Sequence, residues 1–192
     1  MGLIVHPITS ETIRRFRDQY HIKCAVETGT FQGLGTSWLA NNFEQVYTIE
    51  ICEEYQNQAK EILKRFNNIQ YFLGDSRDKL SLVVNQLTSS TLFWLDAHNT
   101  IQVYGPGPDD CPILEELSAI LDSPLKHCIL IDDMNAFLPI EQKIHLSKMP
   151  LDAQYWPSLN VIMKQVEQAN YMCYINPIID LMVVVPKDFA FT

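Results

Sequence analysis

The chain has 192 residues, of which 47% are hydrophobic and 19% are charged, and its formal net charge at pH 7 is −9. This composition excludes a disordered chain, and the length predicts one domain, 1–192, with a full-sized core. The acidic balance, with no basic run longer than Arg14-Arg15, argues against a nucleic-acid partner because phosphate binding needs positive charge. We therefore expect a small-molecule substrate.

Five cysteines form no C-x-x-C pair, and Cys24, Cys128 and Cys173 lie in apolar, strand-like runs. This placement is typical of reduced thiols in a core. No apolar stretch reaches the ~18 residues of a membrane span, and no basic-then-apolar leader opens the chain. Together these features predict a cytoplasmic protein that does not enter a membrane.

The first predicted element is a helix over about 11–20, which Thr9 or Ser10 can cap. Ile13, Phe16 and Tyr20 share one of its faces. We expect this helix, within residues 1–21, to cover one end of a sheet.

A glycine-rich loop follows a short predicted strand at 23–26. The run reads Val26-Glu27-Thr28-Gly29-Thr30-Phe31-Gln32-Gly33-Leu34-Gly35-Thr36-Ser37, and a helix is predicted to begin near its end. Such a loop can hold a small ligand over the helix N-terminus, because glycine permits the backbone angles and leaves space that a Cβ would take from the ligand. The dinucleotide fingerprint would need glycine where Phe31 stands, and the phosphate loop would need a lysine after Gly35.

The next predicted strand, 45–50, ends at Glu50. Glu50 follows Gly29 at the ~20-residue offset at which a carboxylate meets ribose hydroxyls in doubly wound folds. An amphipathic helix is predicted over 53–66. Its expected buried stripe consists of Tyr55, Ala59, Ile62, Leu63 and Phe66.

A third strand, 69–73, leads through Gly74-Asp75-Ser76 into a helix at about 77–87. Asp75 is placed to act as a helix cap, as a ligand contact, or as both. A fourth strand, 91–95, ends at Asp96-Ala97-His98. We expect Asp96 and His98 to face the same edge of the sheet.

The residues after the fourth strand contain Gly105-Pro106-Gly107-Pro108, which excludes helix and strand. They predict a lid loop over 97–111, with Tyr104 as a substrate contact. Pro112 then opens a helix through about 121 as its first residue.

The fifth predicted strand, 127–131, ends at Asp132-Asp133. Because parallel strands end at the same edge of a sheet, acidic residues at many strand ends indicate one ligand site. The acidic residues at or just after the five strand ends are Glu27, Glu50, Asp75, Asp96 and Asp132.

A helix at about 158–169 precedes two β-rich runs, 171–175 and 181–185, which predict an antiparallel hairpin. The predicted fold is α/β and Rossmann-like: a doubly wound, mostly parallel seven-stranded sheet with a C-terminal antiparallel hairpin. Tyr155 and Trp156 are candidates for an exposed interface in a homo-oligomer.

The pattern E-x-G-x-x-x-G-x-G-T after a strand resembles the first motif of class I S-adenosylmethionine-dependent methyltransferases, with Phe31 in place of the middle glycine. Glu50, Gly74-Asp75-Ser76 and the hairpin resemble later features of that family. The resemblance implies S-adenosylmethionine as the cofactor and methyl transfer to an oxygen of a small molecule. The cofactor-binding residues it implies are Glu27, Gly29, Thr30, Phe31, Gly33, Thr36, Glu50, Ile51, Asp75, Ser76 and Asp96.

The strings at 92–98, 111–117 and 129–133 resemble, more distantly, metal-dependent O-methyltransferases that act on macrolide and aminocoumarin sugars. That resemblance implies that Asp96, Asp132 and Asp133 hold Mg²⁺, whose preferred ligands are carboxylate oxygens. A metal-bound hydroxyl loses its proton more readily, and Asp96 or His98 is the predicted catalytic acceptor of that proton. Equally, Asp132-Asp133 can be a solvated turn, and His98 can serve only to bind the lid.

Two other functions fit the same topology. One is an NAD-dependent oxidoreductase, which Phe31 disfavours because it breaks the dinucleotide fingerprint. The other is a non-catalytic S-adenosylmethionine-binding module, which the short chain favours because it has no separate substrate domain.

Overall fold

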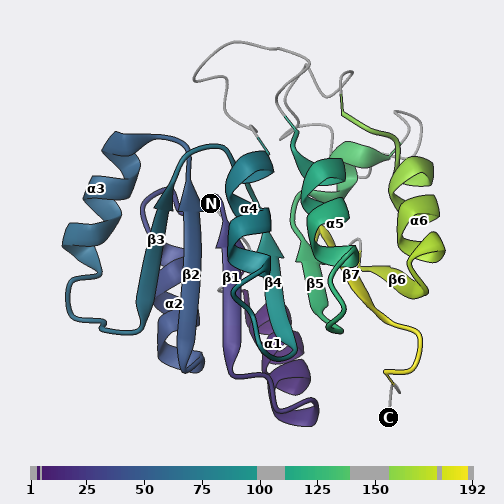
Figure 1. Cartoon of the computed structure of the whole chain (residues 1–192), viewed down its shortest axis with the longest axis horizontal. Helices are drawn as coiled ribbons and strands as arrows, with labels where there is room; N and C mark the ends of the chain where they lie inside the picture. Colours follow the sequence, from purple (N-terminus) through teal and green to yellow (C-terminus); the bar gives the residue numbers. More distant parts are fainter. Residues whose placement is uncertain (1–3, 5, 99–110, 139–155, 177–178, 190–192) are drawn as a thin grey trace.

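The computed structural model describes residues 4, 6–98, 111–138, 156–176 and 179–189 (Figure 1). Within these ranges seven strands form one sheet in the order β3-β2-β1-β4-β5-β7-β6. Neighbours among β1 to β5 run parallel, and β7 is antiparallel to both β5 and β6. The strands are β1 Cys24–Thr28, β2 Gln45–Glu50, β3 Ile69–Leu73, β4 Thr91–Leu95, β5 Cys128–Ile131, β6 Tyr171–Asn176 and β7 Leu181–Pro186. The predicted fold class is therefore confirmed.

Helices cover both faces of the sheet (Figure 1). Within the described residues they are α1 Pro7–Gln19, α2 Leu34–Asn42, α3 Glu53–Ile62, α4 Ser76–Val84, α5 Ile113–Leu121 and α6 Leu159–Gln168, together with the short 3-10 helix η2, Met134–Phe137. One core lies between the sheet and α4, α5 and α6, and a second core lies between the sheet and α1 and α2.

Strand β4 shows why the central strands are apolar throughout. Successive side chains point to opposite faces, so Phe93 enters the α4–α5–α6 core and Trp94 enters the α1–α2 core. Both are almost completely buried. A strand covered on both faces reads as a continuous apolar run, and this made β4 recognisable from its sequence.

The start of α1 differs from the prediction. His6 is the N-cap, its Nδ1 accepts the backbone N–H of Ile8, and Pro7 is the first helical residue. Proline suits this position because its fixed φ is helical and its missing N–H would have no partner there. Thr9 and Ser10, the predicted caps, are buried inside the helix.

The predicted stripe of α3 is wrong at Ile62, which is 62% exposed. The helix ends at this residue, short of the predicted end at Phe66, and its buried positions are Gln56 and Ala59, followed by Leu63 as the C-cap. The stripe is thus rotated toward Gln56, whose side-chain Oε1 accepts a hydrogen bond from Lys60 Nζ. At α5, Pro112 is the N-cap and not the first helical residue.

Trp156 is also placed differently from the prediction. It is buried against His98 and Phe137, with ring centroids 5.0 and 5.1 Å away, so it is not an exposed interface residue. Tyr155, Tyr104 and most of the predicted lid, residues 99–110, lie outside the described residues. No helix in the described ranges has the length and apolar composition needed to cross a membrane.

Candidate active site

The carboxyl ends of the parallel strands bring most of the predicted residues to one edge of the sheet. In the strand register Thr28 pairs with Ile49 on one side and with Leu95 on the other, and Ile131 pairs with Leu95. The residues that follow these positions therefore meet above the centre of the sheet, where doubly wound folds bind ligands.

The glycine loop takes left-handed backbone angles at three positions. Gly29 has φ 84°, Gly33 has φ 78°, and Phe31, between them, has φ 45°. A Cβ on Gly29 would lie 2.2 Å from the backbone oxygen of Asp96, and a Cβ on Gly33 would lie 2.8 Å from Leu63 Cδ1. The first expected reason for glycine, its backbone freedom, is confirmed. A Cβ at either position would also meet atoms of the protein, and the second expected reason, space for a ligand, stays a prediction.

Phe31 occupies the position of the missing motif glycine and keeps a glycine-like backbone angle. A left-handed angle costs a residue with a Cβ about 1 kcal/mol. Two contacts offset this cost: the Phe31 N–H donates to Glu50 Oε2 at 2.7 Å, and the ring packs edge-on against Tyr55 with centroids 4.7 Å apart. Phe31 therefore holds a left-handed angle of the kind that glycine adopts readily.

Glu50 is a fixed hydrogen-bond acceptor at the edge of the sheet. Its residue is 6% exposed, its Oε2 accepts from Phe31, and its Oε1 accepts the backbone N–H of Cys52 at 2.8 Å. Each carboxylate oxygen can accept a second hydrogen bond. Ile51, beside it, is 64% exposed and offers an apolar surface next to the carboxylate.

Glu27 lies beneath the loop, between the sheet and α2. Its Oε2 accepts hydrogen bonds from the hydroxyls of Thr36 and Thr48, and Thr48 also bonds the Thr30 hydroxyl at 2.6 Å. Burial raises the pKa of Glu27 to about 7, against the opposing effect of the two hydroxyls. A Cβ on Gly35 would lie 2.4 Å from Glu27 Oε1. Glu27 thus supports the loop from below, and its direct contact with a ligand stays a prediction.

The N-terminus of α2 faces the same edge. Its N-cap is Gly33, so no side chain caps the helix. The first N–H groups of a helix have no partner within the helix and carry partial positive charge, which makes this end suitable for an anionic group.

Asp75 is the N-cap of α4. Its Oδ1 accepts the backbone N–H of Arg77 at 2.9 Å, and its Oδ2 lies 2.9 Å from Arg77 Nη1. Ser76, the first helical residue, is buried. The cap role of Asp75 is confirmed, whereas ligand contacts by Asp75 and Ser76 stay predictions.

Glu116 of α5 was not identified from the sequence. Its side chain is completely buried, and burial raises its pKa to about 7. The hydroxyls of Ser76 and Thr28 lie close enough to lower this pKa in part, but neither carboxylate oxygen reaches hydrogen-bond geometry with a partner among the described residues. The signal was present in the sequence, because Glu116 stands on the apolar helical stripe between Ile113 and Leu117.

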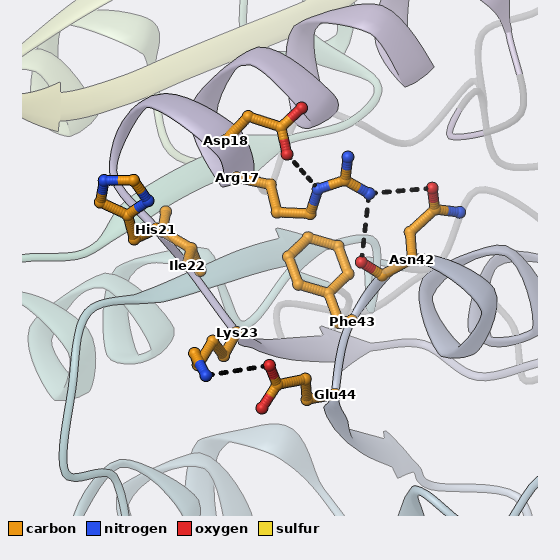
Figure 2. A pocket seen from close by; sticks show the side chains of 8 residues that line it. All are labelled: Arg17, Asp18, His21, Ile22, Lys23, Asn42, Phe43 and Glu44. Carbon is orange, nitrogen blue, oxygen red and sulfur yellow. Dashed lines mark hydrogen bonds and ion pairs between the residues drawn. The ribbon is translucent and has the colours of Figure 1, made fainter.

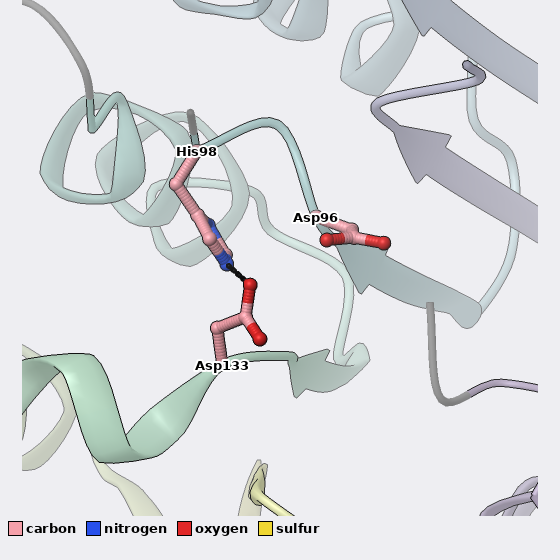
Figure 3. Close-up of side chains that lie close together, drawn as sticks. All are labelled: Asp96, His98 and Asp133. Atoms are coloured by element: carbon pink, nitrogen blue, oxygen red, sulfur yellow. Dashed lines mark ion pairs between the residues drawn. The ribbon is translucent and has the colours of Figure 1, made fainter. Parts of the chain in front are cut away.

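The ends of β4 and β5 bring Asp96, His98 and Asp133 together (Figure 3). One ligand atom from each of these side chains lies within 4.8 Å of the others. His98 Nε2 is 3.7 Å from Asp133 Oδ2. Burial, followed by the charges of Asp132 and Asp133, raises the pKa of Asp96 well above its usual range.

The side chain of Asp132 binds the backbone and does not join this group. It is buried, and its Oδ1 accepts the backbone N–H of Asp133 at 3.0 Å. Asp133 adopts a left-handed φ of 51°, which carries its side chain toward His98. The three side chains that lie together are thus Asp96, His98 and Asp133. The predicted magnesium site had Asp132 in the place of His98. Mg²⁺ takes oxygen ligands, so this set fits it poorly.

Asp180, which the sequence analysis did not identify, holds the segment that follows Asp133. Its Oδ1 accepts the backbone N–H of Asn135 at 2.6 Å, and its backbone oxygen accepts that of Met134 at 3.1 Å. The residue comes just before β7, so the hairpin fixes the start of η2. This relation joins segments that are distant in sequence and no local pattern predicts it.

A hollow of about 320 Å³ lies at the other end of the sheet, beside the residues that precede β1 and β2 (Figure 2). Its lining includes an ion pair between Lys23 and Glu44 at 3.0 Å, and Arg17 Nη1 donates to the backbone oxygen of Asn42. Because it lies at the amino ends of the parallel strands, this hollow is remote from the acidic edge and is not part of the candidate site.

No family model and no curated protein sequence matches this chain. Solved structures do. The O-methyltransferase TomG from Streptomyces achromogenes, solved in complex with S-adenosylmethionine, is 16% identical, with a TM-score of 0.65 over 95% of this chain and 81% of that chain. A Staphylococcus aureus protein described as a caffeoyl-CoA O-methyltransferase is 17% identical, with a TM-score of 0.66 over 96% of this chain and 86% of that chain. An rRNA methylase from Streptococcus thermophilus is 18% identical, with a TM-score of 0.55 over 95% and 98%.

At these identities the similarity concerns the course of the backbone, and activity has to be argued from the site. The strand order has a C-terminal antiparallel pair, and the similarity to TomG and the Staphylococcus aureus protein covers nearly all of this chain. Both observations support the same fold. The chain has the Rossmann-like fold of class I S-adenosylmethionine-dependent methyltransferases.

Proposed function

We infer that this protein is an S-adenosylmethionine-dependent methyltransferase that acts on an oxygen atom of a small molecule. The observation that carries the inference is the meeting, at one edge, of the uncapped α2 N-terminus, the left-handed glycine loop and the fixed carboxylate of Glu50. TomG, which shares the fold, was solved with S-adenosylmethionine.

Each of these features suits one part of the cofactor. The N-terminus of α2 suits its carboxylate, and Glu50 suits the ribose hydroxyls because both of its oxygens retain accepting capacity. The exposed apolar side chain of Ile51, with Asp75 and Ser76 across the edge, suits the adenine. The remaining predicted residues, Glu27, Gly29, Thr30, Phe31, Gly33 and Thr36, form or support the loop.

When bound, S-adenosylmethionine supplies a methyl group that is already activated on a sulfonium. The protein's contribution is then to align the acceptor oxygen with that methyl and to exclude water. Asp96 and His98 stand at the same edge and are the groups proposed to receive the acceptor's proton when no cation is bound to them. No step is assigned to magnesium.

The first test is calorimetric binding of S-adenosylhomocysteine to the whole chain. We expect a dissociation constant on the order of micromolar, weakened about tenfold or more in Glu50→Ala. Glu44→Ala is the matched control, because Glu44 is an exposed carboxylate at the other end of the sheet. Failure of the wild-type protein to bind would refute the proposal, and competitive binding of NADH would favour an oxidoreductase instead.

Turnover separates an enzyme from a binding module. Incubation with methyl-labelled S-adenosylmethionine and a panel of phenols, sugars and RNA should label a small hydroxyl compound. The rRNA methylase of the same fold makes RNA the necessary comparison, although a net charge of −9 opposes RNA binding. Tight cofactor binding without labelling of any acceptor would indicate a non-catalytic module. A location in the cytoplasm and the formation of homo-oligomers stay predictions.

A further inference from the structure

His98 is a buried polar side chain. The residue is 4% exposed, and within the residues that the structure describes neither ring nitrogen has a hydrogen-bond partner of acceptable geometry, although the Asp132 backbone lies near enough to affect the ring. Phe137 and Trp156 pack against the ring with centroids 5.9 and 5.0 Å away. Buried polar groups are nearly always satisfied, so a buried imidazole that packs against two aromatic rings calls for a ligand.

The ring nitrogen Nε2 of His98 points at the carboxylate of Asp133 (Figure 3). His98 Nε2 and Asp133 Oδ2 are 3.7 Å apart, which is too long for a hydrogen bond. It is a suitable separation for two ligand atoms that each lie about 2.1 Å from a shared cation. Asp96 completes the group from the end of β4, with its ligand atom within 4.8 Å of the other two.

We propose that Asp96, His98 and Asp133 bind a divalent first-row transition cation, of the class of Mn²⁺, Fe²⁺, Co²⁺ or Zn²⁺, in preference to Mg²⁺. Imidazole suits these cations, whereas Mg²⁺ selects oxygen ligands and retains its waters. A cation also resolves the electrostatics of the cluster, because it neutralises two adjacent carboxylates and gives the imidazole nitrogen a partner.

Three protein ligands leave coordination positions open, which is typical of catalytic metal sites. Through such a position the cation would orient the acceptor oxygen and make its hydroxyl more acidic. That use of the metal rests on the proposed function. Metal binding itself does not, because it is measured without cofactor or acceptor.

The test is electron paramagnetic resonance of Mn²⁺ titrated into the metal-free full-length protein, since binding removes the six-line signal of the free ion. We expect one Mn²⁺ per chain, retained in a large excess of Mg²⁺. His98→Ala and Asp133→Asn should each weaken binding about tenfold or more. His21→Ala is the matched control, because His21 is exposed and lines the hollow at the other end of the sheet. The Mn²⁺ affinity of this variant should equal that of the wild type.

Circular dichroism of each variant separates lost ligands from lost folding. Asp133→Asn serves as the second variant because its side chain is 35% exposed and the change is nearly isosteric. Displacement of Mn²⁺ by an equal concentration of Mg²⁺, or unchanged affinity in folded His98→Ala, would overturn the proposal. Because S-adenosylhomocysteine binding is measured separately, failure of the metal site and failure of the methyltransferase proposal give different results.

Discussion

At the residue scale, Gly29 shows that a motif position can be required by the protein's own packing. Its backbone passes so close to the segment after β4 that a Cβ would overlap the Asp96 backbone oxygen. Close approach at this point places the glycine loop beside Asp96, and so joins the predicted cofactor and acceptor parts of the site.

Gly29→Ala should therefore destabilise the protein by about 3 kcal/mol, because left-handed strain adds to a clash with backbone atoms that cannot rotate away. Gly74→Ala is the comparison, since Gly74 also has a positive φ but its Cβ would meet only the flexible side chain of Lys79. Urea denaturation of the two variants should show the larger loss at Gly29. Equal losses would mean that backbone strain alone governs both positions.

At the element scale, the short helix η2 is held by a residue far away in sequence. Asp180 receives the N–H groups of Met134 and Asn135, and Asp133 immediately precedes them. The orientation of Asp133 toward His98 therefore depends on the C-terminal hairpin. The candidate metal group is accordingly a property of two strands and a hairpin, and not of a contiguous motif.

Asp180→Ala should cost about 1–2 kcal/mol in unfolding free energy, because it leaves the Asn135 N–H without its acceptor. It should also weaken Mn²⁺ binding, whereas Asp180→Asn, which retains an acceptor oxygen, should be closer to the wild type in both respects. Denaturation curves and the resonance titration measure the two effects. A loss of stability without any change in Mn²⁺ affinity would show that η2 does not position Asp133.

Local patterns in the sequence predict the strands, whereas long-range contacts such as that of Asp180 with η2 are not visible in it. The strands were recognised because strands such as β4 are buried on both faces and are therefore apolar throughout, and Glu50 was placed correctly because parallel strands end together. That His98, and not Asp132, joins Asp96 and Asp133 was not predictable, because it depends on the left-handed φ of Asp133 and on the hydrogen bond that Asp180 accepts from the Asn135 N–H. The start of α1 at His6-Pro7 was missed for a local reason, because neighbouring residues compete to cap a helix.

At the scale of the whole molecule, the fold buries titratable groups whose effects on stability have opposite pH dependences. Burial raises the pKa values of Glu27 and Glu116 to about 7. It lowers those of His98 and His127 to about 4. A raised carboxyl pKa gives stability that is fully present below the unfolded value of about 4.5 and is lost as pH rises through 7. A lowered histidine pKa has the opposite effect between about 4 and 6.5, so the two sets partly cancel.

Glu116→Gln removes one of these terms and disturbs the balance. Relative to the wild type, the variant should gain stability as pH rises from about 4.5 to 7, by at most about 1.4 kcal/mol per pH unit and on the order of 2 kcal/mol in total. Urea denaturation of both proteins at pH 4.5, 6 and 7.5 measures this difference. A pH-independent difference would show that Glu116 has the same pKa in the folded and unfolded chains.

Phe31 has a consequence for how sequences of this kind are recognised. The loop needs a left-handed backbone at that position and an N–H directed at Glu50, and both are present although the side chain is not hydrogen. A sequence motif that requires glycine at this position would miss a chain in which another residue adopts the left-handed angle. In this chain the acidic residues at the strand ends are all in place although one motif glycine is replaced.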